Sequence, residues 1–329
     1  MAVRFIRSVQ VVDSHTGGHP TRVILGGLPA LRGDTVKSQR DDFRARFDAL
    51  RPQLLHEPRG HAAMVGAVLV PSRVADFGVF YISSYVYLEM CGHGTIGLGK
   101  TLAAIGQLPV PEAGSTSFTL ETPAGVVTVG VETAGGTVAR IRIDNVPCHV
   151  IERQVRVEPP GLPAIVTDTA YGGGVFAMVD AKALGWPIVP DQASDLCRKG
   201  AVIKQALNAR QGLPEANKVG SVLFYEDLGP RHARHMVVLE ASKFDRSPCG
   251  TGSSARLAVL HDKGRIGAGE TFRAEGILGA TFDLAIERAT GSGANATIEP
   301  SIRGNAHLTA FSTLVVEEGD PLAGGFLCR

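Results

Sequence analysis

Two short stretches decide the fold of this chain, CGHGT at residues 91–95 and CGTGS at residues 249–253. Both follow the pattern C-G-x-G-[ST]. Small and apolar residues come next, and they predict buried helices over 96–105 and 254–261. The copies lie 158 residues apart in a chain of 329. We therefore expect two similar halves, each with one loop-to-helix junction.

Each junction is suited to bind a small acid. A glycine-rich turn that enters a helix leaves backbone N–H groups at the helix N-terminus, where they and the helix dipole bind a carboxylate or phosphate. The dipole also stabilises a cysteine thiolate at the same end. With two such junctions facing one substrate, one thiolate could remove the α-proton while the other thiol delivers a proton to the opposite face. The N–H groups would stabilise the carboxylate as negative charge builds up. The pattern predicts inversion at an α-carbon by Cys91 and Cys249, and it requires neither a metal nor another cofactor.

Composition excludes several other classes of protein. Hydrophobic residues make up 44% and charged residues 20%, as in an ordinary soluble globular protein. The net charge of +1, without long charged blocks, gives no electrostatic footprint for nucleic acid or for an anionic membrane. The sequence has no run of 18 apolar residues and no signal-peptide pattern at its start, so we expect a cytoplasmic protein.

The remaining cysteines carry no such signal. The five cysteines are widely spaced and form no CxxC pair, which indicates free thiols. Cys148, Cys197 and Cys328 lack glycine-rich turns. An isolated cysteine is most often a small buried apolar residue, and we interpret these three in that way.

A chain of this length predicts two domains. Amphipathic helices are expected over 41–50 and 193–209, and candidate linkers over 132–136 and 159–163. Short runs rich in β-branched residues predict strands over 23–25, 79–83, 126–131, 139–143, 235–239 and 313–316.

Two rival interpretations involve nucleotides or zinc. Residues 94–101 fit the P-loop pattern, and 92–97 and 250–255 fit dinucleotide-binding patterns. The second copy lacks G-K-[ST], and we expect no β-α-β alternation around either copy, so a nucleotide triphosphatase or a dehydrogenase is disfavoured. Residues 56–61 contain two histidines, but their spacing of five and Pro58 disfavour a zinc-binding helix.

The stretches MCGHGTIG at 90–97 and DRSPCGTG at 245–252 resemble the two signature motifs of the proline racemase family, which includes 4-hydroxyproline 2-epimerases and trans-3-hydroxyproline dehydratases. Supporting matches lie at 13–18, 57–61 and 170–173. The resemblance implies an α/β (α+β), diaminopimelate-epimerase-like fold with two similar domains, each a curved sheet around a central helix. The expected domains are 1–136 plus 305–329, which holds the Cys91 helix, and 137–304, which holds the Cys249 helix.

The resemblance also implies roles for particular residues. Cys91 and Cys249 match the acid/base pair, and His93 and Asp245 match side chains near the substrate amine and the thiols. The carboxylate-binding backbone is matched by Gly92, His93, Gly250 and Thr251. A structural hydrogen bond for His93 and a turn or cap for Asp245 remain alternatives. Dehydratases of the family carry threonine at the second thiol position, so Cys249 favours inversion over loss of water.

The substrate is indicated less directly. Proline racemases resemble R-G-H-x-x-M-F along the ring pocket, whereas Val65 follows Met64 here and leaves room for a ring hydroxyl. Val65 as ordinary core filling is the alternative. His19 and Gly174 depart from the family pattern near loops that could touch the substrate. We predict an enzyme with an imino-acid substrate, a 4-hydroxyproline 2-epimerase. The alternatives are a proline racemase, then a trans-3-hydroxyproline dehydratase or a non-catalytic imino-acid binder. The oligomeric state stays open, with a homodimer as one candidate.

Overall fold

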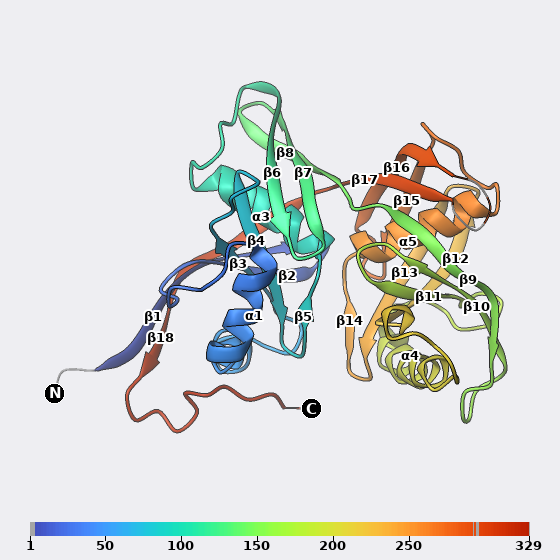
Figure 1. The fold of residues 1–329 in the computed structure, drawn as a ribbon, viewed down its shortest axis with the longest axis horizontal. Coiled ribbons are helices and arrows are strands. Elements are labelled where there is room, and N and C mark those ends of the chain that lie inside the picture. Colours follow the sequence, from blue (N-terminus) through green and yellow to red (C-terminus); the bar gives the residue numbers. More distant parts are fainter. Residues whose placement is uncertain (1–3, 292, 294–295, 329) are drawn as a thin grey trace. The chain divides into compact units, whose positions relative to one another are not determined.

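The computed structural model describes residues 4–291, 293 and 296–328 (Figure 1). It divides into one unit formed by Met1–Ile143 with Asn305–Arg329, and another formed by Asp144–Gly304. The strands and helices of the first unit are β1 (Phe5–Thr16), β2 (His19–Gly26), α1 (Val36–Phe47), α2 (Leu50–Leu55), β3 (Val65–Val70), β4 (Phe77–Ser83), β5 (Tyr87–Leu88), α3 (Gly92–Ala104), β6 (Ala113–Thr122), β7 (Gly125–Ala134), β8 (Thr137–Asp144) and β18 (Ala306–Glu317). Those of the second are β9 (Cys148–Val157), β10 (Ile165–Tyr171), β11 (Val175–Asp180), α4 (Ala193–Asn208), β12 (Ser221–Gly229), β13 (His232–Glu240), β14 (Lys243–Asp245), α5 (Gly250–Asp262), β15 (Thr271–Gly276), β16 (Thr281–Thr290) and β17 (Thr297–Gly304).

The two units have the same strand pairing. In the first, β1–β2, β3–β4, β4–β5 and β6–β7 are antiparallel, and β2–β3 and β4–β6 are parallel. In the second, β10–β11, β12–β13, β13–β14 and β15–β16 are antiparallel, and β11–β12 and β13–β15 are parallel. A further strand closes each set, because β18 pairs with β1 and β9 pairs with β10. The duplication predicted from the two cysteine stretches therefore extends through both units.

One helix of each unit is almost completely buried among strands. α3 packs against β1, β2, β3, β7 and β18, and α5 packs against β9, β10, β11, β16 and β17 (Figure 1). Glycines allow this close approach in α3. A Cβ atom on Gly97 would lie 2.8 Å from the Ser14 hydroxyl, and one on Gly99 would lie 3.3 Å from Ile141. This arrangement of a curved sheet around a central helix confirms the expected diaminopimelate-epimerase-like fold.

The outer helices bury the opposite side of each sheet. In β4, Phe80 and Ile82 belong to a core cluster with residues of α1 and α2, whereas Tyr81 between them reaches α3. Successive side chains of a strand point to opposite faces, so the sheet separates α1 and α2 from α3. In the second unit, α4 contributes Leu196, Ile203 and other residues to a cluster with β11, β12 and β13.

All six predicted strands and both buried helices are present, but several boundaries differ. The helix expected over 41–50 begins earlier, because Thr35 caps α1 by accepting a hydrogen bond from the Ser38 amide. It ends at Phe47, and α2 follows with Pro52 in its first turn, where proline is tolerated.

The two candidate linkers are wrong as linkers. Residues 132–136 form the end of β7 and its turn into β8, and residues 159–163 connect β9 to β10 within the second unit. The first unit extends to Ile143 rather than 136, because Ile141 of β8 packs against Gly99 of α3.

The expectation that no β-α-β alternation surrounds the copies is also wrong. β4 and β6 are parallel neighbours on either side of α3 in the chain, as are β13 and β15 around α5. The pattern is hidden in the sequence because β5 has two residues and β6 begins with the weakly apolar AGSTS.

No helix in the described part of the chain combines the length and the apolar character that a membrane crossing requires.

Candidate active site

In the first unit the candidate site is formed around Cys91. Cys91 precedes the first residue of α3 in an ordinary extended conformation, with φ −143° and ψ 104°, and only 5% of it is exposed. Its sulphur lies 3.4 Å from Nδ1 and 3.7 Å from Nε2 of His93. His93 is buried, and the ring of His19 meets it edge-on with 4.3 Å between centroids. The thiol therefore has an imidazole beside it that could exchange or orient a proton.

The second unit places Cys249 at the same point of α5 but with a different backbone. Cys249 has φ 63° and ψ 99°, in the left-handed range of φ that a residue with a side chain rarely adopts. Such a conformation costs about 1–3 kcal/mol and persists only where the surroundings enforce it. The Gly252 amide donates to the Cys249 sulphur over 3.4 Å, and the Thr251 hydroxyl lies 3.7 Å from it. An N–H donor directed at sulphur stabilises the thiolate form.

The second glycine of each C-G-x-G stretch has a steric reason. A Cβ atom on Gly94 would lie 3.0 Å from the Cys91 sulphur, and one on Gly252 would lie 3.1 Å from the Cys249 sulphur. In both helices a glycine thus leaves the space in which the thiol lies.

A hairpin turn approaches the second residue of each helix. At the β1–β2 turn, the Thr16 hydroxyl donates to the His93 carbonyl over 3.0 Å. At the β10–β11 turn, a Cβ atom on Gly172 would lie 2.3 Å from the Thr251 carbonyl, so only glycine fits. These contacts explain why the stretches T-G-G at 16–18 and Y-G-G at 171–173 accompany the cysteine motifs.

Asp245 and Val65 lie at the ends of strands. Asp245 is the last residue of β14, is buried, and accepts a hydrogen bond of 2.9 Å from the Ser247 amide, which is the turn role given as its alternative. Val65 begins β3 and is 1% exposed. It lies two residues before Ala67, which pairs with Tyr81, so Val65 shares the sheet face that carries α3.

The predicted site residues thus fall into two groups. Cys91, Gly92, His93 and Val65 belong to the first unit, and Asp245, Cys249, Gly250 and Thr251 belong to the second. His19, one of the two departures from the family pattern, contacts a predicted site residue, His93. Gly174 is the other departure, and a Cβ atom built on it would lie 3.5 Å from the ring of Phe176.

Behind the thiols lies a set of buried groups that was not predicted from the sequence. Tyr81 and Thr95 share a hydrogen bond of 2.6 Å in the first unit, and His235 and Ser253 share one of 3.1 Å in the second. Burial, with a further contribution from Cys91, raises the pKa of the Tyr81 phenol. The [ST] position of the motif is the only sequence signal for these pairs.

The other buried cysteines lie in apolar surroundings. Burial raises the pKa of the Cys148 thiol well above its usual range, and it raises the pKa of the Cys197 thiol to about 11. Both thiols are therefore protonated at neutral pH and weakly nucleophilic. Cys328 is exposed.

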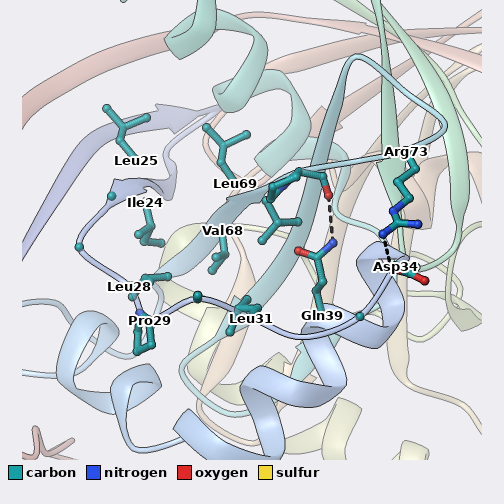
Figure 2. Close-up of a pocket in the computed structure, with 16 residues that line it drawn as sticks. Ile24, Leu25, Leu28, Pro29, Leu31, Asp34, Gln39, Val68, Leu69 and Arg73 are labelled. Carbon is teal, nitrogen blue, oxygen red and sulfur yellow. Dashed lines mark hydrogen bonds and ion pairs between the residues drawn. The ribbon is translucent and has the colours of Figure 1, made fainter.

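Two of the cavities that the described residues form lie in the first unit. One of about 420 Å³ is bounded by β2, β3, the 27–34 loop and α1, with an Asp34–Arg73 ion pair at its rim (Figure 2). It contains none of the predicted site residues. The other, of about 320 Å³, is lined by residues of the 13–18 and 57–61 stretches together with Met64, the neighbour of Val65.

The segment at 57–61 is tied to the C-terminal part of the first unit. Arg59 donates to the carbonyls of Gln53 and Ala323. Arg22 binds Asp13 through two hydrogen bonds and also donates to the Arg59 carbonyl. These contacts give both stretches a structural role. Among the described residues, neither unit by itself groups three or more side chains of the metal-ligating types.

Comparison with known proteins agrees with this geometry. The proline racemase family model matches residues 11–327. A proline racemase from Clostridioides difficile is 34% identical over 99% of this chain and 100% of its own length, and a 4-hydroxyproline 2-epimerase from Brucella suis biovar 1 is 38% identical over 96% and 97%. A crystal structure of a hydroxyproline epimerase from Agrobacterium vitis with bound trans-4-hydroxy-L-proline is 29% identical, with a TM-score of 0.91 over 99% of this chain and 96% of that one. The chain belongs to the proline racemase family.

Proposed function

We propose that this racemase/epimerase family member is a 4-hydroxyproline 2-epimerase that inverts the α-carbon with two thiols, Cys91 and Cys249, and without a cofactor. The observation that carries the proposal is the repeated junction. Each unit places a cysteine at the N-terminus of its central helix, and the third residue of that helix is a glycine that leaves space for the sulphur. A reaction that runs in both directions needs equivalent groups for the two faces of its substrate.

The first step is removal of the α-proton. One thiolate takes the proton from the α-carbon and becomes a thiol, and the electron pair left behind spreads into the carboxylate. Backbone N–H groups at the starts of α3 and α5 stabilise that charge, at Gly92 and His93 in one helix and at Gly250 and Thr251 in the other. These groups have no acceptor within their own helix, so they are suited to an external anion.

The second step delivers a proton from the other thiol to the opposite face. After it the two sulphurs have exchanged protonation states, so the enzyme is ready for the reverse reaction without any outside reagent. The His93 ring lies 3.4 Å from the Cys91 sulphur, and the Gly252 amide donates to the Cys249 sulphur, so each thiol has a polar neighbour that can orient it. Asp245 is proposed to contact the substrate amine in addition to accepting the hydrogen bond from the Ser247 amide in its turn.

The choice of 4-hydroxyproline has two supports. Val65 is a small residue on the α3 face of the sheet, next to Met64 of the 320 Å³ cavity. The Brucella suis relative and the Agrobacterium vitis structure bear the hydroxyproline name. Proline is the second candidate, because the Clostridioides difficile proline racemase matches the chain over nearly all of its length.

Proton NMR in D2O tests the proposal. Purified protein is incubated without cofactor with L-proline, D-proline, trans-4-hydroxy-L-proline or trans-3-hydroxy-L-proline. We expect loss of the α-proton signal and appearance of the epimer, fastest with trans-4-hydroxy-L-proline. A keto or imine product would instead identify a dehydratase, and no exchange with any of the four would mean that the substrate lies outside this group or that the protein only binds.

The two thiols are tested separately. Cys91→Ser and Cys249→Ser should each abolish inversion, because serine at neutral pH is a far weaker base than a thiolate. Both variants should still bind pyrrole-2-carboxylate, a planar mimic of the transition state, in calorimetry. Full activity in either variant would contradict the two-thiol mechanism. Cys197→Ser is the matched control, because that thiol lies on α4.

A further inference from the structure

A chain of buried hydrogen bonds lies directly behind Cys249. Nδ1 of His235 in β13 is 3.1 Å from the Ser253 hydroxyl in α5, and that hydroxyl donates to the Pro248 carbonyl over 2.8 Å. A serine hydroxyl has one proton, and the Pro248 carbonyl can only accept. His235 must therefore donate through Nδ1–H to Ser253. Both side chains are completely buried.

Ser253 holds the peptide planes on both sides of Cys249. Its hydroxyl binds the Pro248 carbonyl, which belongs to the plane before Cys249, and its amide donates to the Cys249 carbonyl over 2.8 Å, which belongs to the plane after it. The Ser247 hydroxyl accepts from the Cys249 amide over 3.1 Å and holds the first plane at its other end. Two fixed planes determine φ and ψ of the residue between them.

Cys249 needs such a restraint, whereas Cys91 does not. The φ of Cys249 is 63°, but Cys91 has an unstrained φ of −143°. The first unit has a related arrangement, in which Tyr81 contacts the Thr95 hydroxyl and that hydroxyl donates to the Cys91 carbonyl over 2.8 Å. There, the hydroxyl and the amide of Thr95 both bind the same carbonyl, so Thr95 holds the plane after Cys91 but not the plane before it.

The geometry points to Ser253 and His235 as positioning residues, which hold Cys249 in its left-handed conformation and so keep its sulphur against the Gly252 amide. This inference rests on the proposed role of Cys249 for its catalytic consequence. If the restraint is removed, Cys249 relaxes toward negative φ, and its sulphur leaves the N–H donor that stabilises the thiolate.

His235 offers an informative pair of variants. Its Nε2 atom has no hydrogen-bond partner among the described residues, so only Nδ1–H contributes to the chain of hydrogen bonds. The amide nitrogen of asparagine takes nearly the position of Nδ1. His235→Asn should therefore preserve the restraint, and His235→Leu should remove it. Likewise Ser253→Thr keeps the hydroxyl, as Thr95 does in the first unit, and Ser253→Ala removes it.

The experiment measures iodoacetamide labelling of Cys249 and Cys91 as a function of pH, peptide by peptide and without substrate. In Ser253→Ala and His235→Leu we expect the pH of half-maximal Cys249 labelling to rise by about one unit, and that of Cys91 to stay unchanged. Ser253→Thr and His235→Asn should restore the Cys249 value. The matched control Thr95→Val should leave Cys249 labelling unchanged. With substrate, kcat of the two disruptive variants should fall about tenfold with little change in KM.

An unchanged Cys249 midpoint in the disruptive variants would overturn the inference, as would equal shifts at Cys91 and Cys249, which indicate general loosening. If Ser253→Ala fails to fold, the comparison of His235→Leu with His235→Asn decides. If the protein epimerises none of the imino acids, the proposed function fails, but the labelling result still decides the role of Ser253 and His235.

Discussion

The Gly252 amide donates a hydrogen bond to the Cys249 sulphur over 3.4 Å, and the same residue leaves the sulphur its space, because a Cβ atom there would lie 3.1 Å away. One residue thus supplies both a donor and a gap. Gly94 leaves the same gap for Cys91 in the other unit. The C-G-x-G pattern is therefore explained by the position of the sulphur as well as by an anion site at the helix N-terminus.

Gly94→Ala and Gly252→Ala should each lower kcat by about tenfold or more, because a methyl group displaces the sulphur from the position the reaction needs. Stability should fall as well, because the new methyl group would lie 3.0 Å from the Tyr81 ring in one variant and 3.1 Å from Leu223 in the other. Such overpacking typically costs about 1–3 kcal/mol, more than the about 0.5–1 kcal/mol by which alanine is favoured over glycine in a helix. Steady-state kinetics and thermal unfolding measure the two effects. Gly130→Ala is the control. A Cβ atom on Gly130 would lie 3.5 Å from its nearest neighbour, the Arg142 Cβ, which is an ordinary van der Waals contact. Full activity in both variants would show that the sulphurs do not need these gaps.

Alkylation should distinguish the thiols. At pH 8 iodoacetamide should label Cys91 and Cys249 and inactivate the enzyme, and pyrrole-2-carboxylate should protect both. Cys197, with a pKa raised by burial to about 11, is ionised to only about one part in a thousand at that pH, and Cys148 still less. A Cys328→Ser background removes the exposed thiol from the measurement. Inactivated protein labelled only at Cys148 or Cys197 would contradict the assigned site.

The duplicated fold was predictable because its signal is local. The thiol, the glycines and the small residues that let a helix be buried are adjacent in the chain, and the second copy repeats them. The helix boundary at Thr35 was missed because hydrophobic periodicity starts after a cap, and the β-α-β pattern was missed because the two-residue β5 carries no periodicity.

The restraints behind the thiols could not be predicted in the same way. His235 lies 18 residues before Ser253, and only the register of β13 places its ring against the α5 hydroxyl. The left-handed φ of Cys249 gives no sequence signal either, because glycine and asparagine are the usual indicators of that conformation. The neighbouring residues in the sequence are enough to identify the two thiols, whereas the backbone geometry of each thiol depends on contacts with distant parts of its unit.

The substrate preference should respond to Val65. Val65→Phe fills space on the α3 face of the sheet, so kcat/KM for trans-4-hydroxy-L-proline should fall relative to that for L-proline, by about tenfold. The ratio of the two values, measured with one enzyme preparation, is independent of the fraction folded. Val68→Phe, in the core cluster on the opposite face, is the control for overpacking and should leave the ratio unchanged. An unchanged ratio in Val65→Phe would make Val65 ordinary core filling.

The buried His235 should also make the fold sensitive to acid. Burial, reinforced by nearby Arg256, lowers the pKa of His235 to about 3, so the folded chain keeps this imidazole neutral at pH values where the unfolded chain binds a proton, below about 6.5. Because the unfolded state then holds one proton more, stability falls with decreasing pH over this window, by up to about 1.4 kcal/mol per pH unit from this group. His235→Asn lacks the titrating group. The difference in unfolding free energy between wild type and variant, from urea titrations between pH 7.5 and 4.5, should therefore shift in favour of the variant as pH falls. A difference that is constant across the window would mean that His235 is protonated in the folded chain at acidic pH. The neutral state of His235 would then be wrong, whereas its role as donor to Ser253 would still hold.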